Sequence, residues 1–331
     1  MSKLETEKAI LWTIAVAVRT AWVSGLVILL AGAVASPVSA AEGGTGHYVP
    51  GALATLIDLP PTQQGWVLEA AYVHYGGDVS IDIPIAGLDT AGLDVEADSL
   101  LLGAFYTRGL PIEGLFYSVG AFLPYVWMDA KAEVRTPLGP LRRRDSASGI
   151  GDLTIIPGML AWKRGSWQLN ALLPIFAPTG DYDVGRLANP GLNYWSFDPT
   201  VVASFNHETT GFNAALHLGV MFNTENTDTD YQTGDLFHME ASLQQLLPLG
   251  PGFASIGAEA FYLDQIEGDS GSGARLGNFE RRSVGVGPVL GYVLPHGDNN
   301  NFVVEFRWLP EIETKHQLEG DYFWLKVIYQ F

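Results

Sequence analysis

Cysteine is absent from the chain, and basic residues are scarce. Without cysteine, its 331 residues cannot form disulfide scaffolds, thiolate zinc sites, iron–sulfur clusters or cysteine nucleophiles. Charged residues make up only 16% of the chain, whereas a typical soluble domain has about 25%. The 18 basic residues are outnumbered by 36 acidic ones, which gives a formal net charge of -18. Because clustered Lys and Arg bind phosphate backbones, we do not expect nucleic acid as a partner.

The abundant residue types favour strands joined by tight turns. The chain is 47% hydrophobic and 11% aromatic, with 38 Gly and 19 Pro. Aromatic residues are enriched in strands, and Gly and Pro are enriched in turns. The sequence contains no motif of a phosphate-binding loop, a serine-hydrolase elbow or a zinc peptidase. We therefore expect an all-β fold and no bound cofactor.

Residues 1–40 are predicted to be a signal peptide. Basic residues precede an apolar run at 21–34, and the sequence VSA at 38–40 offers the small residues that a signal peptidase reads. A membrane-anchor helix over 10–35 is the alternative, because a membrane span needs about 20 apolar residues. Arg19 divides that stretch, which leaves a run of the length found in signal peptides.

Beyond residue 40, apolar and polar residues alternate over many short stretches. From 212 to 223, Phe, Ala, Leu, Leu, Val and Phe occupy one face, opposite Asn, Ala, His, Gly, Met and Asn. The stretches 197–206, 236–247 and 302–309 repeat this pattern. Alternation with period two gives each strand one apolar and one polar face. A two-sheet sandwich and a barrel that crosses a membrane both satisfy this pattern.

The lengths of the connections favour the barrel over the sandwich. Short turns and longer polar loops alternate along the chain, and both ends of the strand region fall on the short-turn side, as in outer-membrane barrels. We predict a closed antiparallel transmembrane β-barrel with short periplasmic turns and long extracellular loops, the longest at 76–96 and 129–148. About twelve strands are expected, at residues 66–75, 97–108, 114–128, 149–163, 167–178, 195–206, 212–223, 235–247, 253–264, 279–293, 302–311 and 319–331.

The end of the chain also indicates an outer-membrane protein. Phe331, Tyr329 and Val327 lie on one face of the last expected strand. This arrangement resembles the signal by which bacterial outer-membrane proteins are recognised for assembly. We therefore expect the barrel assembly machinery, outer-membrane lipid and lipopolysaccharide as partners, in the outer membrane of a Gram-negative bacterium. The domains are then the signal peptide at 1–40, a periplasmic or luminal plug-like segment at 41–65 and the barrel at 66–331.

Three motifs carry a family resemblance: GHYVPG at 46–51, GIGDL at 149–153 and APTGDY at 177–182. With the strand layout, they resemble the outer-membrane protein family of the meta-pathway of phenol degradation. The resemblance implies a twelve-strand outer-membrane barrel, often encoded near enzymes of aromatic catabolism, that admits hydrophobic or aromatic compounds. It transfers no catalytic or substrate-binding residue. The motifs consist of turn residues and aromatics, which mark architecture rather than chemistry.

Polar residues on the expected strands are predicted to line a wet lumen, and no catalytic, cofactor-binding or metal-binding residue is assigned. His217 and His238 lie on the polar faces of neighbouring strands near Glu240, so a weak metal or acid–base site is an alternative to an ordinary lumen. Inward Arg281, Arg282, Arg307 and Lys326 are expected to pair with Glu259, Glu305 or Asp264. The candidate lumen-lining residues are Asp152, Asp198, Thr200, Asn213, His217, His238, Glu240, Gln244, Glu259, Glu305, Arg307 and Lys326.

The leading hypothesis is a channel or transporter for passive uptake of small hydrophobic or aromatic compounds, linked to phenol degradation and without enzyme activity. One alternative is an outer-membrane lipid-modifying enzyme, although no spacing of Ser and His identifies a nucleophile. Another is a structural or adhesive barrel whose loops bind partners. Residues 42–64 are long enough to enter the barrel as a plug, which would turn an open channel into a gated one.

Overall fold

The computed structural model describes residues 46–136, 139–275, 280–297 and 300–331. The predicted signal peptide lies outside these ranges. The described part is mostly strand and includes one short 3-10 helix, η2 (Leu56–Asp58). Within it, no helix has the length and apolar character needed to cross a membrane.

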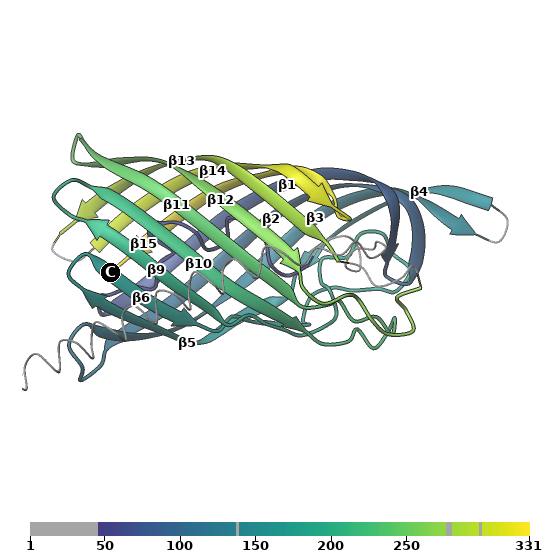
Figure 1. The fold of residues 1–331 in the computed structure, drawn as a ribbon, viewed down its shortest axis with the longest axis horizontal. Coiled ribbons are helices and arrows are strands. Elements are labelled where there is room, and N and C mark those ends of the chain that lie inside the picture. Colours follow the sequence, from purple (N-terminus) through teal and green to yellow (C-terminus); the bar gives the residue numbers. More distant parts are fainter. Residues whose placement is uncertain (1–45, 137–138, 276–279, 298–299) are drawn as a thin grey trace, which may run out of the picture. The chain divides into compact units, whose positions relative to one another are not determined.

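One antiparallel sheet of 15 hydrogen-bonded segments closes on itself to form a barrel (Figure 1). The first segment, β1, pairs with the last, β15, from Val67 opposite Gln330 to Asp78 opposite Glu319. This closure pairs the two sheet edges that lipid would not tolerate, and β4, which extends beyond the ring, pairs with β3 alone. The segments are β1 (Gly65–Ile85), β2 (Leu88–Gly109), β3 (Leu115–Thr136), β4 (Gly139–Ile150), β5 (Leu153–Arg164), β6 (Trp167–Leu172), β7 (Ile175–Ala177), β8 (Ser196–Phe197), β9 (Thr200–His207), β10 (Phe212–Asn223), β11 (Leu236–Leu249), β12 (Gly252–Gln265), β13 (Arg282–His296), β14 (Asn300–Lys315) and β15 (Glu319–Gln330).

These segments fill twelve positions of the ring, which confirms the predicted closed twelve-strand barrel. β4 and β5 share one position, as do β6 with β7 and β8 with β9, because both members of each pair bond to a common neighbour. The three interruptions fall at residues 151–152, 173–174 and 198–199. Pro174 and Pro199 contribute to them because proline has no N–H to donate across a sheet.

The predicted long loops at 76–96 and 129–148 are wrong, because strands occupy most of both stretches. β1 continues to Ile85, turns at Ala86 and Gly87, and returns as β2. Both turn residues have positive φ, 46° and 79°, which suits a tight two-residue hairpin. β3 and β4 form a second hairpin that extends beyond the end of the ring (Figure 1).

Packing between the two hairpins and a loop explains why these two stretches are strands. The loop between β7 and β8 places Leu187 against the two hairpins, where its side chain is 0% exposed. The Leu187 N–H donates to the Asp145 carboxylate on β4 at 3.1 Å, so the loop is also bonded to the second hairpin. The cluster around Leu187 includes Ile85, Leu93, Val95, Ala130 and Val134.

The two faces of each strand differ as the alternation predicts. On β14, Glu305 is 1% exposed, whereas the next residue, Phe306, is 40% exposed. All twelve positions of the ring carry large apolar side chains that are exposed on the outside. In water such a surface would cause aggregation, whereas in lipid it is the expected outer face.

Phe331 is bonded to the start of the first strand of the ring. The Phe331 N–H donates to the Trp66 carbonyl at the start of β1, at 2.9 Å. Tyr329 and Phe331 stack with ring centroids 5.4 Å apart, and Val327 lies on the same face of β15. Their recognition as an assembly signal stays a prediction.

Truncation of Leu187 should loosen the hairpins without opening the ring. Removing a buried Leu side chain costs about 2–5 kcal/mol, so L187A should accelerate hydrogen exchange in the parts of β1–β4 beyond the ring. V184A is a matched control in the same loop, because Val184 is 53% exposed. Mass spectrometry of both variants checks this, and unchanged exchange in L187A would contradict the packing described above.

Candidate functional site in the barrel lumen

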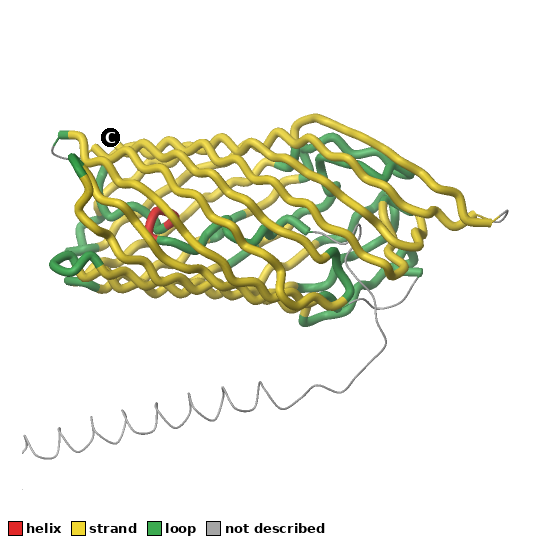
Figure 2. Tube along the Cα trace, turned by 90° about the horizontal axis from the view of Figure 1, so that it is seen from above, coloured by secondary structure: helices red, strands yellow, loops and turns green. Residues whose placement is uncertain are grey.

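Residues 46–64, called the N-terminal segment below, run inside the ring. Figures 1 and 2 show this segment and its short helix η2 surrounded by strands. Its contacts come from distant positions of the ring. Gln168 on β6 donates to the Pro60 carbonyl at 2.9 Å, and Lys326 on β15 donates to the Ala52 carbonyl at 2.7 Å. The segment therefore occupies the lumen.

Inward side chains pair the backbone of the N-terminal segment, which has no strand partner in the sheet. Trp324 Nε1 donates to the Pro50 carbonyl at 2.8 Å, and the Gly51 N–H donates to the Glu240 carboxylate at 3.1 Å. Gly51 has a φ of 84°, and a Cβ there would lie 2.6 Å from the Trp324 ring nitrogen. Only glycine fits this bend, because any other side chain would be strained and would collide with the wall.

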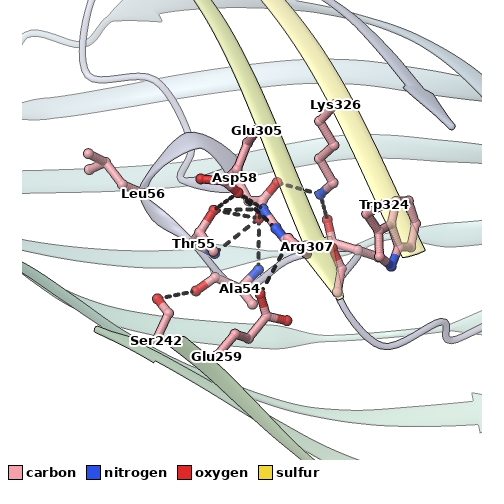
Figure 3. Close-up of polar contacts among 12 residues, drawn as sticks. Ala54, Thr55, Leu56, Asp58, Ser242, Glu259, Glu305, Arg307, Trp324 and Lys326 are labelled. Atoms are coloured by element: carbon pink, nitrogen blue, oxygen red, sulfur yellow. Dashed lines mark hydrogen bonds and ion pairs between the residues drawn. The ribbon is translucent and has the colours of Figure 1, made fainter. Parts of the chain in front are cut away.

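Asp58 joins the N-terminal segment to two buried cations (Figure 3). Lys326 Nζ lies 2.6 Å from Asp58 Oδ1, and Arg307 Nη2 lies 2.5 Å from Asp58 Oδ2. Arg307 also pairs with Glu305 at 2.6 Å and lies 3.5 Å from Glu259. Burial alone would raise the pKa of Asp58, but the charges of Arg307 and Lys326 outweigh it and hold the pKa below its usual range. A buried cation without a partner is costly, so this cluster ties the segment to β14 and β15.

The residues predicted to line the lumen are all buried in the structure. The two expected pairs of Arg307 are confirmed. Arg282 does pair with Asp264 at 3.0 Å, but the two side chains are 38% and 26% exposed. They alternate with the buried Ser283 and Leu263, so this pair lies on the outer face of the ring and the predicted inward position of Arg282 is wrong. Lys326 is a correction, because it bonds to Asp58 of the N-terminal segment rather than to a carboxylate of a neighbouring strand. The buried set is Asp152, Asp198, Thr200, Asn213, His217, His238, Glu240, Gln244, Glu259, Glu305, Arg307 and Lys326.

The two histidines that suggested a metal or acid–base site lie against the N-terminal segment. His217 is opposite Glu240 in the β10–β11 pair. His238 bonds to Asp198 at 2.7 Å, and its ring stacks on Tyr48 with centroids 3.8 Å apart. Tyr48 in turn donates its hydroxyl hydrogen to Glu240. Across the described ranges, no three His, Asp or Glu side chains are placed to hold a metal ion.

A Ser–His–Asp arrangement forms in the lumen, between the N-terminal segment and the barrel wall. His47 Nε2 lies 2.9 Å from Asp152, and its Nδ1 lies 2.7 Å from the Ser196 hydroxyl. Ser196 donates to Asn223 Oδ1 at 2.6 Å, because the Asn223 amide nitrogen is directed to the Gly234 carbonyl. The arrangement fastens His47 to the wall.

A cavity of about 290 Å³ lies beside the N-terminal segment, toward β1–β5. Most of its lining is aliphatic or aromatic, and on the segment side it is bounded by Tyr48, Val49 and Leu53. The N-terminal segment is thus held on the side of β11–β15, and the cavity beside it is mostly apolar, although Glu69, Asp152, Asp198 and Lys326 also contribute to its lining. The wall residues that β1–β3 contribute include Val73, Val95, Leu101, Phe122, Val126 and Met128.

Sequence reasoning did not identify His47 or Asp58 as residues of this site. Both belong to a stretch in which apolar and polar residues do not alternate, so the pattern predicts neither a strand nor an inward face there. Thr55 and Asp58 form a local capping box, with the Thr55 N–H donating to Asp58 at 3.0 Å, and this spacing can be recognised in a sequence. The contact of Asp58 with Arg307 could not be anticipated, because it depends on the path of the segment through the ring.

A ring of twelve antiparallel strands with an apolar outside and a polar inside has the fold of outer-membrane β-barrels. The chain belongs to the family described as "Putative MetA-pathway of phenol degradation", whose model matches residues 75–327. The resemblance seen in the sequence is therefore confirmed. None of the curated proteins matches the chain.

Several solved structures are similar to the chain. An outer-membrane channel from Pseudomonas putida F1 is 14% identical with a TM-score of 0.60, and the match covers 86% of this chain and 100% of that one. The β-domain of a Bordetella autotransporter is 13% identical with a TM-score of 0.47, covering 81% and 100%. The translocator domain of a Neisseria meningitidis autotransporter is 13% identical with a TM-score of 0.44, covering 81% and 89%. At 14% identity, the likeness to the first establishes the fold alone.

Replacement of Asp58 by Asn should release the N-terminal segment from the cations. Because the pKa of Asp58 is lowered, its stabilisation is present above the ordinary value of 3.8 and is lost as the pH falls below it. D58N should speed hydrogen exchange of residues 46–60 at pH 7 by about tenfold or more, since breaking a buried ion pair costs several kcal/mol. The difference in exchange rate between D58N and the native protein should shrink below pH 3.8.

The control is D94N, which breaks an exposed pair between Asp94 and Lys131 at 3.4 Å and should leave exchange in the N-terminal segment unchanged. Equal exchange of residues 46–60 in D58N and the native protein at pH 7 would show that Asp58 does not hold the segment.

Proposed function

We propose that the chain is an outer-membrane channel that admits small hydrophobic or aromatic molecules by passive diffusion, without catalysis of its own. The observation that carries the proposal is the apolar cavity inside the lumen. Water-filled barrels have polar interiors, whereas here β2 and β3 line the lumen with side chains such as Leu101, Phe122 and Met128. Burial of an apolar solute gains about 25 cal/mol per Å² of surface, so this lining favours apolar molecules over ions and sugars.

Two further facts support the proposal. The description of the family refers to phenol degradation, and phenol is a small aromatic molecule. The fold is shared with an outer-membrane channel from Pseudomonas putida F1. The proposal includes export by the signal peptide at 1–40, insertion by the barrel assembly machinery, and contact of the outer face with lipid and lipopolysaccharide.

The proposal assigns the N-terminal segment the role of a plug. It fills the side of the lumen next to β11–β15 and bounds the cavity, so a solute has to pass beside it or displace it. Its contacts through Asp58 and His47 lie at different places along the segment, on β14 and β15 and near the β4–β5 break. Part of the segment can therefore move while the rest stays bound.

Deletion of residues 46–62 should convert the barrel into a wider pore. The charges of Arg307 and Lys326 would then face water, which solvates them, so the ring should still fold. Single-channel conductance in planar bilayers is expected to rise severalfold over that of the native protein. Conductance that stays at the native level in a folded deletion protein would contradict the plug. Folding is checked by the shift in gel mobility on heating.

Uptake measurements test the channel itself. A strain that lacks the protein should take up radiolabelled toluene more slowly than the complemented strain when toluene is limiting. Uptake of a small hydrophilic sugar serves as the control and should be equal in both strains. Equal toluene uptake with and without the protein would contradict the proposed function.

A further inference from the structure

Two pieces of chain that are not strands close the lumen cavity toward the hairpins. One is residues 189–193, called the roof segment below, which belong to the loop between β7 and β8. The other is the start of the N-terminal segment. The loop also packs against both hairpins through Leu187, and Figure 2 shows loops crossing that end of the ring. The lining residues that the two pieces contribute are Asn189, Pro190, Leu192, Gly46, His47 and Tyr48.

A single carboxylate holds both pieces. Asp152 lies in the break between β4 and β5, and its side chain is 4% exposed. Its Oδ2 accepts the Leu192 N–H of the roof segment at 2.7 Å and lies 2.9 Å from His47 Nε2. Its Oδ1 accepts the Gly180 N–H at 2.9 Å. One oxygen of Asp152 is therefore shared by the roof segment and the N-terminal segment, and the other bonds to the first part of the loop.

The first part of this loop belongs to the wall of the barrel. The Asp181 N–H donates to the Ile150 carbonyl at 2.9 Å, and the Leu153 N–H donates to Thr179 Oγ1 at 3.0 Å. These two bonds join residues 179–181 to both sides of the β4–β5 break. Gly180 therefore fixes the Asp152 side chain to the wall.

Other bonds of the roof segment go to loops. The Gly191 N–H donates to the Asp181 carbonyl at 3.0 Å, and Asn193 Nδ2 lies 2.9 Å from Asn226 Oδ1 in the loop between β10 and β11. Gly191 also packs on the backbone of Gly180, because a Cβ on Gly191 would lie 2.8 Å from the Gly180 Cα. Only glycine allows this approach. The shared carboxylate is therefore the group that joins the roof segment to the N-terminal segment.

The surroundings of His47 couple the two pieces further. Its ring stacks on Phe176 of β7 with centroids 4.9 Å apart, and it meets the ring of Tyr194 edge-on at 5.0 Å. The His47 side chain is 5% exposed. Tyr194 directly follows the roof segment in the chain. Movement of His47 and movement of the roof segment therefore disturb the same contacts.

We infer that the roof segment and residues 46–48 form one gate over the cavity, and that Asp152 is the positioning residue that holds this gate closed. If either piece leaves alone, a buried carboxylate loses a donor while it stays enclosed, which is costly. The two pieces therefore open together. The rest of the N-terminal segment stays in place, because Asp58 binds it to Arg307 and Lys326. The inference rests on the proposed function and states where the channel is controlled.

Hydrogen exchange of the purified full chain in detergent micelles at pH 7 tests the role of Asp152. An amide has one oxygen, so the side chain of D152N cannot accept from Gly180 on one side and from Leu192 on the other. D152N should therefore speed exchange of residues 46–49 and 189–193 by about tenfold or more, because hydrogen bonds to a charged group are the strong ones. Exchange of residues 52–60 should stay within about twofold of the native rate, because Asp58 still holds them.

The variant H47L tests the coupling, because it changes only the N-terminal segment. Leucine keeps an apolar side chain against Phe176 and removes the bond to Asp152. Exchange of residues 189–193 should nevertheless rise by about threefold or more. The double variant D152N/H47L should match D152N within about twofold, since both changes break the same bond. D183N is the matched control, because Asp183 is an exposed carboxylate of the same loop, and it should leave exchange in both pieces unchanged.

Single-channel recording in planar bilayers tests the gate itself. D152N should open about threefold more often than the native protein or more, because its closed state has lost stabilisation. Its unitary conductance should stay at the native value, since the Asp58 cluster keeps the rest of the N-terminal segment in the lumen. D183N should open as often as the native protein. Folding of each variant is checked by the shift in gel mobility on heating, and H47L carries both measurements if D152N does not fold.

Two results would overturn the inference. One is exchange of residues 189–193 that is unchanged in H47L, and the other is a folded D152N channel that opens at the native frequency. A native protein that gives no gain in toluene uptake would remove the proposed function instead. The exchange measured in H47L would then still decide whether the two pieces open together.

Discussion

Complete pairing of the backbone is the constraint on which the rest of this structure depends. An unpaired N–H or C=O group in lipid costs several kcal/mol, so the sheet has to close, and β1 bonds to β15. Closure turns the period-two alternation of the strands into an inside and an outside. Apolar side chains face outward, and each polar side chain on the opposite face is enclosed in a lumen of limited width.

Enclosure creates a second requirement, because inward cations need partners. Arg307 is bound by Glu305 of its own strand, by Glu259 of β12 and by Asp58 of the N-terminal segment, and Lys326 is bound by Asp58 as well. The segment is thus held by charges that the barrel itself brings inside. On β2 and β3 the inward side chains are mostly apolar and offer the segment few bonds, so a cavity remains there. The same ring therefore provides both an anchored segment and an apolar binding space.

Predictions from the sequence are correct where the alternation of neighbouring residues alone decides on which face of a strand a side chain lies. Alternation placed Glu305 inside and Phe306 outside, and the structure agrees. The prediction of long loops at 76–96 and 129–148 is wrong, because the polar residues there belong to strands. In the structure, alternate residues such as Leu93 and Val134 are buried in the cluster around Leu187. A strand that packs against that cluster and a strand that faces lipid both show alternation with period two. The pattern therefore does not tell whether the apolar face of a strand contacts protein or lipid.

The sequence by itself determined the all-β class, the number of strands and the inward set of polar residues, because each depends on the spacing of neighbours along one strand. The tertiary structure alone decided that Asp58 meets Lys326 and that His47 meets Asp152. It also decided that Leu192 bonds to the same carboxylate as His47. These residues lie far apart in the chain, and they come together only because the closed ring encloses a segment that carries no periodic signal of its own.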